Sequence, residues 1–405
     1  MSELNLGSGD RPLPLAGVTV LDLGQIYQGP YCGFLLAMAG ARVIKVEPPT
    51  GEPMRARGPS LPAAMLNSGK EAIAIDLKQP SGLAILLDLA VHADVMLMNF
   101  APGVPERLGL GYDAVHAVND RLVYAQASGF GVRDPDGTLV DSPTPAMDIT
   151  IQASSGAMMT TGYEDTPPLK AGVAYIDFLG GTHLYGAITT ALFERERTGR
   201  GRSIEVSMED TAHFALTSSL AQWQRTGSTT RPGNRQASGL APYNVYRCAD
   251  GWLAIITSAP RHWPALIEAM GRPELGEDDR FRSAGRRTHN VEALDQEIEA
   301  WTSGLRRDDA MERLRVARVP AATVRTVDEA VRDERRHARR SMQWVDDPDL
   351  GEVPLGYSPI RFHESPIFEL DPAPSLGRDT DRVLAELLGL SSDRIGDLQA
   401  HGVVA

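Results

Sequence analysis

The chain has 405 residues, of which 42% are hydrophobic and 23% charged, and its formal net charge at pH 7 is −13. These values are ordinary for a soluble globular protein with a large core. The acidic balance excludes a general binder of nucleic acid or of anionic membranes, although a local basic pocket could still hold a small anion.

The cysteines, the histidines and the apolar runs of the sequence argue against several further classes of protein. The two cysteines, Cys32 and Cys248, are far apart, so no disulfide framework is indicated and a cytoplasmic location is expected. The nine histidines show no metal-ligand spacing, so no metal site is expected. No apolar run is long enough to span a membrane, and the polar, acidic N-terminus does not resemble a signal peptide.

The first elements form a strand–helix–strand pattern. Residues 18–23 (VTVLDL) and 42–47 (RVIKVE) predict strands, and the segment between them has the apolar content of a helix. Two strands joined by a helix predict a parallel sheet with a right-handed crossover. Gly24, Gly29 and Gly33 follow a G-x4-G-x3-G spacing rather than G-x-G-x-x-G, so a dinucleotide site is not expected.

The same alternation continues to about residue 208. The predicted strands of this region are 72–77, 94–99 and 121–126. A helix is predicted over 81–92, and a short helix carries Arg107. Residues 48–62 are rich in proline and glycine and predict an extended loop. The repeated alternation predicts one doubly wound α/β domain.

Residues 171–210 contain the clearest candidate for chemistry. Residues 173–176 (VAYI) predict a short buried strand, a helix follows, and residues 203–207 predict the next strand. Asp177 would then lie at the hinge between strand and helix, close to Gly180 and Gly181. Its carboxylate is either a helix N-cap or a nucleophile that the glycines leave open to another molecule. Spacing alone does not choose between the two.

In the second half of the chain the regular alternation of predicted strands and helices ends. A helical stretch runs from 209 to about 226, and two short strands then flank the turn Asp250–Gly251 before further helices. This change predicts a second, smaller domain at about 228–325. Residues 328–340 predict a densely charged helix, and residues 380–390 predict an amphipathic helix near the C-terminus.

Seven stretches of the sequence, in one unbroken order, closely resemble the class III CoA-transferase family of the CaiB/BaiF type. Three of them are LAGVTVLDLGQIYQGPYCGFLLAMAGARVIKVEPP, DVMLMNFAPGVPERLGLGYD and FERERTGRGRSIEVSMED; the others are residues 67–82, 148–162, 241–252 and 374–389. The family includes formyl-CoA transferase, carnitine CoA-transferase and α-methylacyl-CoA racemase.

The resemblance implies an α/β fold with a large Rossmann-like domain built from both chain ends and a smaller α+β domain. Residues 1–227 would form the first part of the large domain, 228–325 the small domain, and 326–405 a linker that returns to the large domain. Two chains would interlock like links in a homodimer.

The resemblance also implies an enzyme that moves CoA from an acyl-CoA donor to a carboxylic acid through a covalent aspartyl intermediate. The residue that matches the family's nucleophile is Asp177. Its carboxylate would attack the donor thioester, the released CoA thiolate would attack the resulting anhydride, and the acceptor acid would run the steps in reverse. The CoA thioester is a substrate, and no permanently bound cofactor or metal is implied.

Further positions match the family's CoA-binding and substrate segments. The matching CoA-binding residues are Tyr27, Gln28, Ile75, Asp76, Leu77, Lys78, Asn99, Phe100, Ala101 and Arg107. The matching substrate-loop residues are Ser238, Gly239 and Leu240. The cation of Arg107 suits a phosphate of CoA, and its alternative is a surface salt bridge. The alternative for Phe100 and Ile75 is ordinary core packing.

The chain also departs from the family pattern. Pro48 stands where some relatives place a phosphate-binding arginine, so either Lys45, Arg55 or Arg57 replaces it or the phosphate site is weaker. The loop QASGL has one glycine, which argues against oxalate or formyl-CoA as substrates.

Three other functions compete with the transferase. A racemase needs a second acid/base group, and Met147 occupies the position of the racemase histidine. A CoA-binding subunit without chemistry could have lost its aspartate, whereas Asp177 is present. A lyase acting on an acyl-CoA is the third.

Overall fold

The computed structural model describes residues 11–140, 145–236 and 239–405. Their contacts divide them into two units. The first takes the described part of Met1–Ile151 together with Val173–Ala212 and Asp333–Ala405, and the second takes Gln152–Gly172 and His213–Arg332. The predicted domain boundaries differ from these units and stay predictions.

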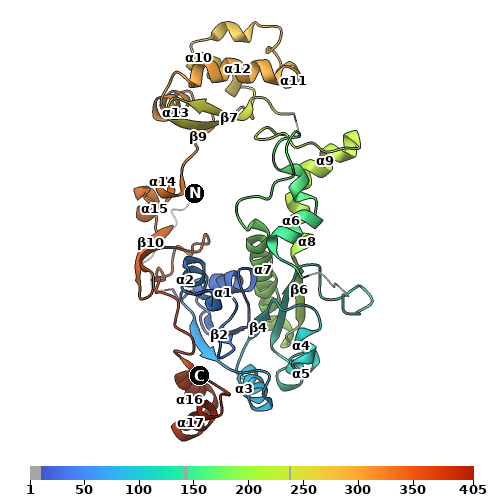
Figure 1. Ribbon diagram of the computed structural model, residues 1–405, viewed down its shortest axis with the longest axis vertical. Helices are drawn as coiled ribbons and strands as arrows, with labels where there is room; N and C mark the ends of the chain where they lie inside the picture. The colour runs from blue at the N-terminus through green and yellow to red at the C-terminus, as the bar shows by residue number, and fades with distance from the viewer. Residues whose placement is uncertain (1–10, 141–144, 237–238) are drawn as a thin grey trace. The chain divides into compact units, whose positions relative to one another are not determined.

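The first unit is built on a six-stranded sheet in which every neighbouring pair is parallel (Figure 1). Its strands are β1 (Thr19–Asp22), β2 (Arg42–Glu47), β3 (Glu71–Ala74), β4 (Val95–Met98), β5 (Val123–Ser128) and β6 (Ser203–Ser207). The strand order is β3-β2-β1-β4-β5-β6, so the direction of winding reverses between β1 and β4. In doubly wound sheets, ligands bind at the carboxyl ends of the strands beside such a reversal.

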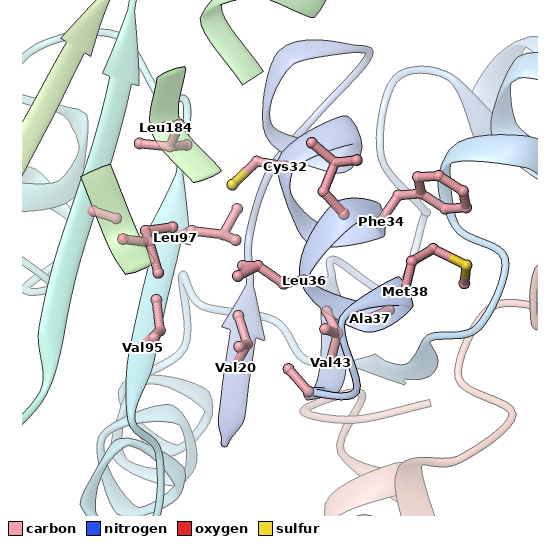
Figure 2. Close-up of a cluster of buried hydrophobic side chains, with 14 of the residues drawn as sticks. Val20, Cys32, Phe34, Leu36, Ala37, Met38, Val43, Val95, Leu97 and Leu184 are labelled. Carbon is pink, nitrogen blue, oxygen red and sulfur yellow. The ribbon is translucent and has the colours of Figure 1, made fainter. Parts of the chain in front are cut away.

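Alternate residues of each strand supply two separate cores, as the two-residue period of a strand requires. On one face Val20, Val95 and Leu97 pack with α1 (Gln28–Met38) and α7 (Tyr175–Thr198), and Figure 2 shows this cluster around Cys32 and Leu184. On the other face the neighbouring residues of the same strands, such as Leu21 and Met96, pack under four other helices. These helices are α3 (Pro80–Val91), α5 (Tyr112–Val118), α16 (Thr380–Leu388) and α17 (Ser392–Ala400).

Shorter elements complete the first unit. They are α2 (Leu61–Leu66), α4 (Val104–Arg107), α15 (Glu334–Ala338), the 3-10 helix η1 (Arg55–Arg57) and the antiparallel pair β10 (Met342–Asp347) and β11 (Gly351–Gly356). Two helices, α6 (Asp148–Ser154) and α8 (Met208–Ala215), contain residues of both units.

The second unit contains a three-stranded antiparallel sheet in the order β7-β8-β9. The strands are β7 (Tyr243–Cys248), β8 (Gly251–Ile256) and β9 (Ala321–Thr323). Its helices are η2 (Ala157–Thr160), α9 (Thr217–Thr226), α10 (His262–Ala269), η3 (Pro273–Gly276), α11 (Ala284–His289), α12 (Val291–Thr302), α13 (Arg307–Val316) and α14 (Val327–Val331).

Several predictions from the sequence are confirmed. The parallel sheet is present, β6 has the predicted bounds, and β7 and β8 flank the predicted turn. Both cysteines are free and buried. Among the described residues no helix is long and apolar enough to cross a membrane. The same residues contain no cluster of His, Cys, Asp and Glu that could hold a metal ion, and the expectation of no metal site stays a prediction.

Other predictions are wrong. Residues 173–176 are not a strand, because Ala174 is the N-cap of α7 and the helix begins at Tyr175. A run of four apolar residues fits a strand and the start of a buried helix equally well. The charged segment 328–340 forms two short helices, α14 and α15, since Asp333 caps a new helix with its side chain. The predicted loop 48–62 contains η1 and the start of α2.

Candidate active site

A cavity of about 400 Å³ opens at the carboxyl ends of β1, β4, β5 and β6. This position is the one that the reversal of strand order predicts. Its walls come from the segments that follow these four strands, from residues 145–147 and from α7. The lining residues are Gln25, Ile26, Gln28, Asn99, Phe100, Ala101, Pro102, Ser128, Gly129, Phe130, Gly131, Pro145, Ala146, Met147, Asp177 and Met208.

Asp177 enters this cavity from the first turn of α7. The N-cap residue is Ala174, which has no capping side chain, and the Asp148 carboxylate instead accepts a hydrogen bond from the Ile176 N–H at 3.0 Å. Asp177 is therefore not the N-cap, and the capping alternative for it is wrong. Because the Asp148 carboxylate accepts the hydrogen bond of the Ile176 N–H, the Asp177 carboxylate is not needed to cap the helix.

The surroundings of Asp177 disfavour its charged form. Burial and, secondarily, the nearby Asp148 carboxylate raise the pKa of Asp177 to about 7. Among the described residues, the Asp177 carboxylate has no hydrogen-bond partner. A carboxyl group that titrates near neutrality in a cavity is a candidate for acid/base or nucleophilic chemistry.

Gly180 and Gly181 do not leave room for a ligand, contrary to the sequence-based expectation. Both are buried against α1. A Cβ at Gly181 would lie 2.7 Å from the Gln28 carbonyl oxygen and 3.0 Å from the Tyr31 ring, and one at Gly180 would lie 2.5 Å from the Gln28 side-chain nitrogen. The glycines therefore allow α1 and α7 to approach closely, which brings Gln28 next to the turn that carries Asp177.

The loop between β1 and α1 forms one wall of the cavity, and side chains from distant parts of the chain hold its backbone. The Asn99 amide bridges Gln25, accepting from its N–H at 2.7 Å and donating to its carbonyl at 3.0 Å. The Glu52 carboxylate accepts from the Ile26 N–H at 3.1 Å. Ile26 has a φ of 64°, which is unfavourable for a β-branched residue, so these bonds hold a strained conformation.

A buried charge cluster supports the same loop from behind. Lys70 donates to Asp22 at 2.7 Å, and both side chains have no exposed surface. Asp22 also accepts from the Gly24 N–H at 2.8 Å, and Lys45 donates to the Gly24 carbonyl. Lys70 pairs with the Asp22 carboxylate and Lys45 donates to a neutral backbone carbonyl, so both ammonium groups have partners inside the fold.

Of the predicted CoA-binding residues, Gln28, Asn99, Phe100 and Ala101 line the cavity. Gln28 is 2% exposed, and its side-chain nitrogen is buried without a hydrogen-bond partner among the described residues. A buried donor without a partner is costly unless a ligand satisfies it. Tyr27 does not line the cavity but packs against Phe178, with ring centroids 6.0 Å apart.

Arg107 is not among the residues that line the cavity, but it lies close to the lining segment 99–102. It is an exposed residue at the end of α4, and a Cβ at Gly103 would come within 3.1 Å of its guanidinium. Gly103 directly follows the lining residue Pro102. Among the described residues Arg107 has no ion-pair partner, so a surface salt bridge does not account for it.

The remaining predicted residues lie elsewhere. Ile75 is fully buried in the core, so its side chain offers no surface to a ligand, and Asp76 accepts from the Lys78 N–H at 3.0 Å. Leu77 packs beside the same core. None of residues 75–78 lines the cavity.

The substrate-loop residues belong to the second unit. Ser238 lies outside the described residues. The Gly239 carbonyl accepts from the Thr288 hydroxyl, and Gly239 has a φ of 81°, which favours glycine. Leu240 is exposed. The roles of these residues stay predictions.

Three cations were proposed to replace the arginine that some relatives carry at the position of Pro48. Two of them already have partners within the protein. Lys45 is 1% exposed, so the suggestion that it binds a phosphate is wrong. Arg55 donates to Glu47 at 2.9 Å and to the Pro374 carbonyl at 2.8 Å. Arg57 is exposed and has no ion-pair partner among the described residues.

Sequence reasoning missed several residues of this site. Ser128 ends β5, Phe130 comes shortly after it, and Met208 follows β6, so the rule that ligands bind at the carboxyl ends of parallel strands would have found these lining residues. Asp148 and Glu52 act through contacts with segments far along the chain, for which the sequence carries no local signal.

The chain matches known proteins along most of its length. A family model described as CoA-transferase family III matches residues 15–380. The succinyl-CoA--D-citramalate CoA-transferase of Chloroflexus aurantiacus is 35% identical over 98% of this chain and 100% of its own. The formyl-CoA:oxalate CoA-transferase of Streptomyces coelicolor is 32% identical over 96% of this chain and 99% of its own.

Solved structures match as well. A CAIB/BAIF family protein from Brucella suis has a TM-score of 0.81 and 30% identity, covering 93% of this chain and 100% of its own. A hypothetical protein from Mycobacterium tuberculosis has a TM-score of 0.80 and 28% identity, covering 93% and 99%.

Proposed function

The chain belongs to CoA-transferase family III, and from this premise we propose that it transfers CoA between two carboxylic acids through a covalent intermediate on Asp177. It is an enzyme, as are the CoA-transferases that it resembles over nearly its full length. The single observation that carries the proposal is that Asp177 is the one ionisable side chain among the described residues that line the cavity.

The proposed reaction has four steps. The Asp177 carboxylate attacks the thioester carbonyl of the donor, the C–S bond breaks, and a mixed anhydride and CoA thiolate result. The thiolate attacks the aspartyl carbonyl of the anhydride, which frees the donor acid and leaves an aspartyl–CoA thioester. The acceptor carboxylate attacks the carbonyl of this thioester, the C–S bond breaks, and a second mixed anhydride and CoA thiolate result. The CoA thiolate then attacks the acyl carbonyl of the acceptor and restores the Asp177 carboxylate.

The position of Asp177 suits these steps. It lies in the first turn of a 24-residue helix, where backbone N–H groups and the helix dipole favour the negative charge that develops on each tetrahedral oxygen. The carboxylate forms no internal ion pair or hydrogen bond among the described residues, so no such bond has to break before it attacks. The unpartnered amide of Gln28 supplies a further donor in the same cavity.

The segment 99–107 suits the nucleotide part of CoA. Asn99, Phe100 and Ala101 line the cavity, and Arg107 at the end of α4, which is not a lining residue, has no ion-pair partner among the described residues. A guanidinium that has no internal partner can bind a phosphate with charge-assisted hydrogen bonds. We assign binding of the nucleotide part to this segment and place the thioester near Asp177 and Gln28.

A racemase is not supported by the site. Racemization requires an acid/base group on each face of the α-carbon. Met147 lines the cavity next to Asp148 and cannot move a proton. The described lining residues supply only Asp177 for this purpose.

A trapping experiment tests the covalent step. Wild-type enzyme incubated with acyl-CoA and quenched with hydroxylamine should be modified at Asp177, as peptide mass spectrometry would show. The Asp177→Asn variant keeps the shape of the side chain but should form neither the adduct nor a new thioester. Turnover by this variant close to that of the wild type would exclude the mechanism.

We also propose that the working enzyme is a homodimer of interlocked chains. The support is the resemblance to the family together with the order of the two units, in which segments of the first bracket the second in sequence. Large apolar side chains such as Phe193 and Phe214 are 66% and 77% exposed in the single chain, as expected of surfaces that a second copy covers.

A further inference from the structure

The loop between β1 and α1 has an unfavourable backbone conformation at the point where it lines the cavity. Its residues Gln25 and Ile26 are lining residues, and so is Gln28, the first residue of α1. Ile26 has a φ of 64°, in the left-handed region. A β-branched side chain crowds the backbone there, so this conformation persists only where the surroundings hold it.

A helix end does not account for the conformation of Ile26. Arg318 and Arg340 are the other non-glycine residues with positive φ in the described part of the chain, and each comes two residues after the end of a helix, α13 or α15. That position commonly takes the left-handed conformation, because it closes the helix. Ile26 instead precedes a helix. Backbone strain that local structure does not require points to a functional constraint.

One buried carboxylate oxygen holds the strained residue. Oε2 of Glu52 accepts from the Ile26 N–H and from the Met54 N–H, both at 3.1 Å. Glu52 is 2% exposed and does not line the cavity, so it acts on the cavity through Ile26. Its other oxygen, Oε1, is buried and has no hydrogen-bond partner among the described residues. The loop therefore depends on the reach of one oxygen.

Glu52 is itself fixed to the central sheet. Its N–H donates to the Glu47 carboxylate at 3.1 Å, and Glu47 is the last residue of β2. The Arg55 guanidinium donates to the same carboxylate at 2.9 Å. Ile26 and these three residues all belong to the first unit. Their hydrogen bonds therefore do not depend on what the second unit or a second chain adds to the cavity.

The parts of the loop on either side of Ile26 are held as well. The Asn99 side chain bonds both backbone groups of Gln25. A Cβ at Gly24 would lie 2.7 Å from the Cα of Gly29, so the two ends of the loop are in contact. Because its neighbours are fixed, Ile26 cannot pass its strain to them by small adjustments.

We infer that Glu52 is a positioning residue of the transfer reaction, because it holds Ile26 in the left-handed conformation and so fixes Gln28 relative to Asp177. The inference rests on the proposed function and adds a residue to it. Relaxation of Ile26 would turn the chain just before α1 and displace Gln28, which packs against α7 one turn from Asp177. A misplacement of about 1 Å at reacting groups is enough to slow a reaction by on the order of a hundredfold.

Two conservative variants separate the reach of Glu52 from its charge. Glu52→Gln keeps the length of the side chain and an oxygen for both N–H groups, whereas Glu52→Asp keeps the charge and is shorter by one CH₂ group. We expect kcat near the wild-type value for Glu52→Gln and lower by on the order of tenfold for Glu52→Asp, with the dissociation constant for free CoA unchanged in both.

The rate to measure is the entry of an isotope-labelled free acid into its own CoA ester. The acids are acetate, succinate and benzoate, and the one that the wild type exchanges fastest is used for all variants. A greater loss in Glu52→Gln than in Glu52→Asp would assign the role to the charge and overturn the inference. Wild-type kcat in Glu52→Asp would overturn it too.

Rescue at Ile26 tests whether strain is what Glu52 holds. Ile26→Gly removes the side chain and the strain, because glycine adopts a positive φ freely, whereas Ile26→Ala removes most of the side chain and keeps the Cβ. Adding Glu52→Asp should lower kcat and the denaturant midpoint of unfolding strongly beside Ile26→Ala and clearly less beside Ile26→Gly. Equal losses in the two backgrounds would overturn the inference.

A matched control excludes rescue by general stabilisation. Arg318→Gly relieves a positive φ of 55° in the second unit, far along the chain from the loop. Added to Glu52→Asp, it should leave kcat as low as in Glu52→Asp alone. Recovery of kcat equal to that given by Ile26→Gly would show that the rescue is not specific to the loop and would overturn the inference.

Failure of this inference is distinct from failure of the proposed function. The unfolding midpoints need no reaction, whereas the hydroxylamine trap reports the bond to Asp177. A wild type that forms no adduct, with midpoints that follow the expected rescue, would contradict the covalent function alone. A trapped adduct in the wild type, with an undiminished kcat in Glu52→Asp, would contradict the positioning role alone.

Discussion

Asp177 occupies a position where two effects on its pKa compete. The N-terminus of α7 favours the carboxylate, whereas burial and the charge of Asp148 disfavour it, and the balance raises its pKa to about 7. A carboxylate of higher basicity is a better nucleophile, but a larger fraction of it is protonated at neutral pH. The site therefore gains reactivity and becomes sensitive to pH in the physiological range.

The pH dependence of the reaction should reveal this group. Since the neutral acid does not attack, kcat/KM for acyl-CoA should rise with pH through a limb near 7. Asp148→Asn removes the neighbouring charge but keeps an oxygen for the Ile176 N–H, so the limb should move to lower pH. Initial rates measured from pH 5 to 9 would show this, and a limb that stays in place would mean that Asp148 does not act on Asp177.

The difference in unfolding free energy between the Asp177→Asn variant and the wild type should depend on pH. Because the pKa is raised in the folded state, ionisation of Asp177 destabilises the wild type progressively between its unfolded pKa near 4 and about 7. The variant should thus be more stable at pH 8 by on the order of 1–3 kcal/mol, and this difference should vanish below pH 4. Denaturant unfolding at both pH values measures it, and an equal difference at both would contradict the raised pKa.

Arg107 should contribute to binding rather than to folding. It is exposed and has no ion-pair partner among the described residues, so Arg107→Ala should leave the unfolding free energy within about 0.5 kcal/mol of the wild type. The loss of a charge-assisted phosphate contact should weaken CoA binding by roughly 1–3 kcal/mol. The control is Arg121→Ala, whose guanidinium donates to the Gly199 carbonyl, with unchanged CoA affinity expected. Equal CoA affinity in Arg107→Ala and the wild type would remove Arg107 from the site.

At the scale of elements, the packing of α1 against α7 sets the distance between Gln28 and Asp177. The contact depends on Gly181, because a Cβ there would lie 2.7 Å from the Gln28 carbonyl, a backbone atom that cannot turn aside. Helices that cross this closely need small residues at the point of contact, and added volume strains both helices. The two glycines after Asp177 are thus explained by helix packing.

A pair of alanine variants on α7 separates packing from helix propensity. Gly181→Ala should destabilise the protein by about 1–3 kcal/mol through overpacking, and it should lower kcat by displacing Gln28. Gly186→Ala, on an exposed turn of the same helix where a Cβ meets nothing within 4 Å, should instead stabilise by roughly 0.5–1 kcal/mol. Thermal and denaturant unfolding of both variants provide the measurement, and a stabilising Gly181→Ala would contradict the close contact.

At the scale of the whole molecule, the chain is expected to work as a pair. In the proposed dimer of interlocked chains, the second copy would cover the exposed apolar side chains of the single chain. Light scattering at micromolar concentration should therefore give twice the chain mass of 43.8 kDa. Because interlocked chains cannot separate without opening, dilution to nanomolar concentration should not produce folded monomers within hours. A compact, active monomer would contradict the proposed dimer.

The sequence by itself determined the elements whose signals are local. Strand β6 was predicted with its observed bounds because residues 203–207 alternate apolar and polar side chains, and α7 ends at Gly199, which caps it at a φ of 75°. The parallel sheet followed from the order of strands and helices along the chain. The candidate nucleophile came from the family resemblance, since spacing left its role open.

Only the tertiary structure decided how these elements make a site. Asp148 caps α7 from 28 residues earlier, Asn99 holds Gln25 across 74 residues, and Glu52 holds Ile26 across 26. Local periodicity carries no information on such pairs, because each depends on which strand ends lie side by side in the folded sheet. The packing roles of the two glycines and the burial of Asp177, which raises its pKa, therefore followed only from the tertiary structure.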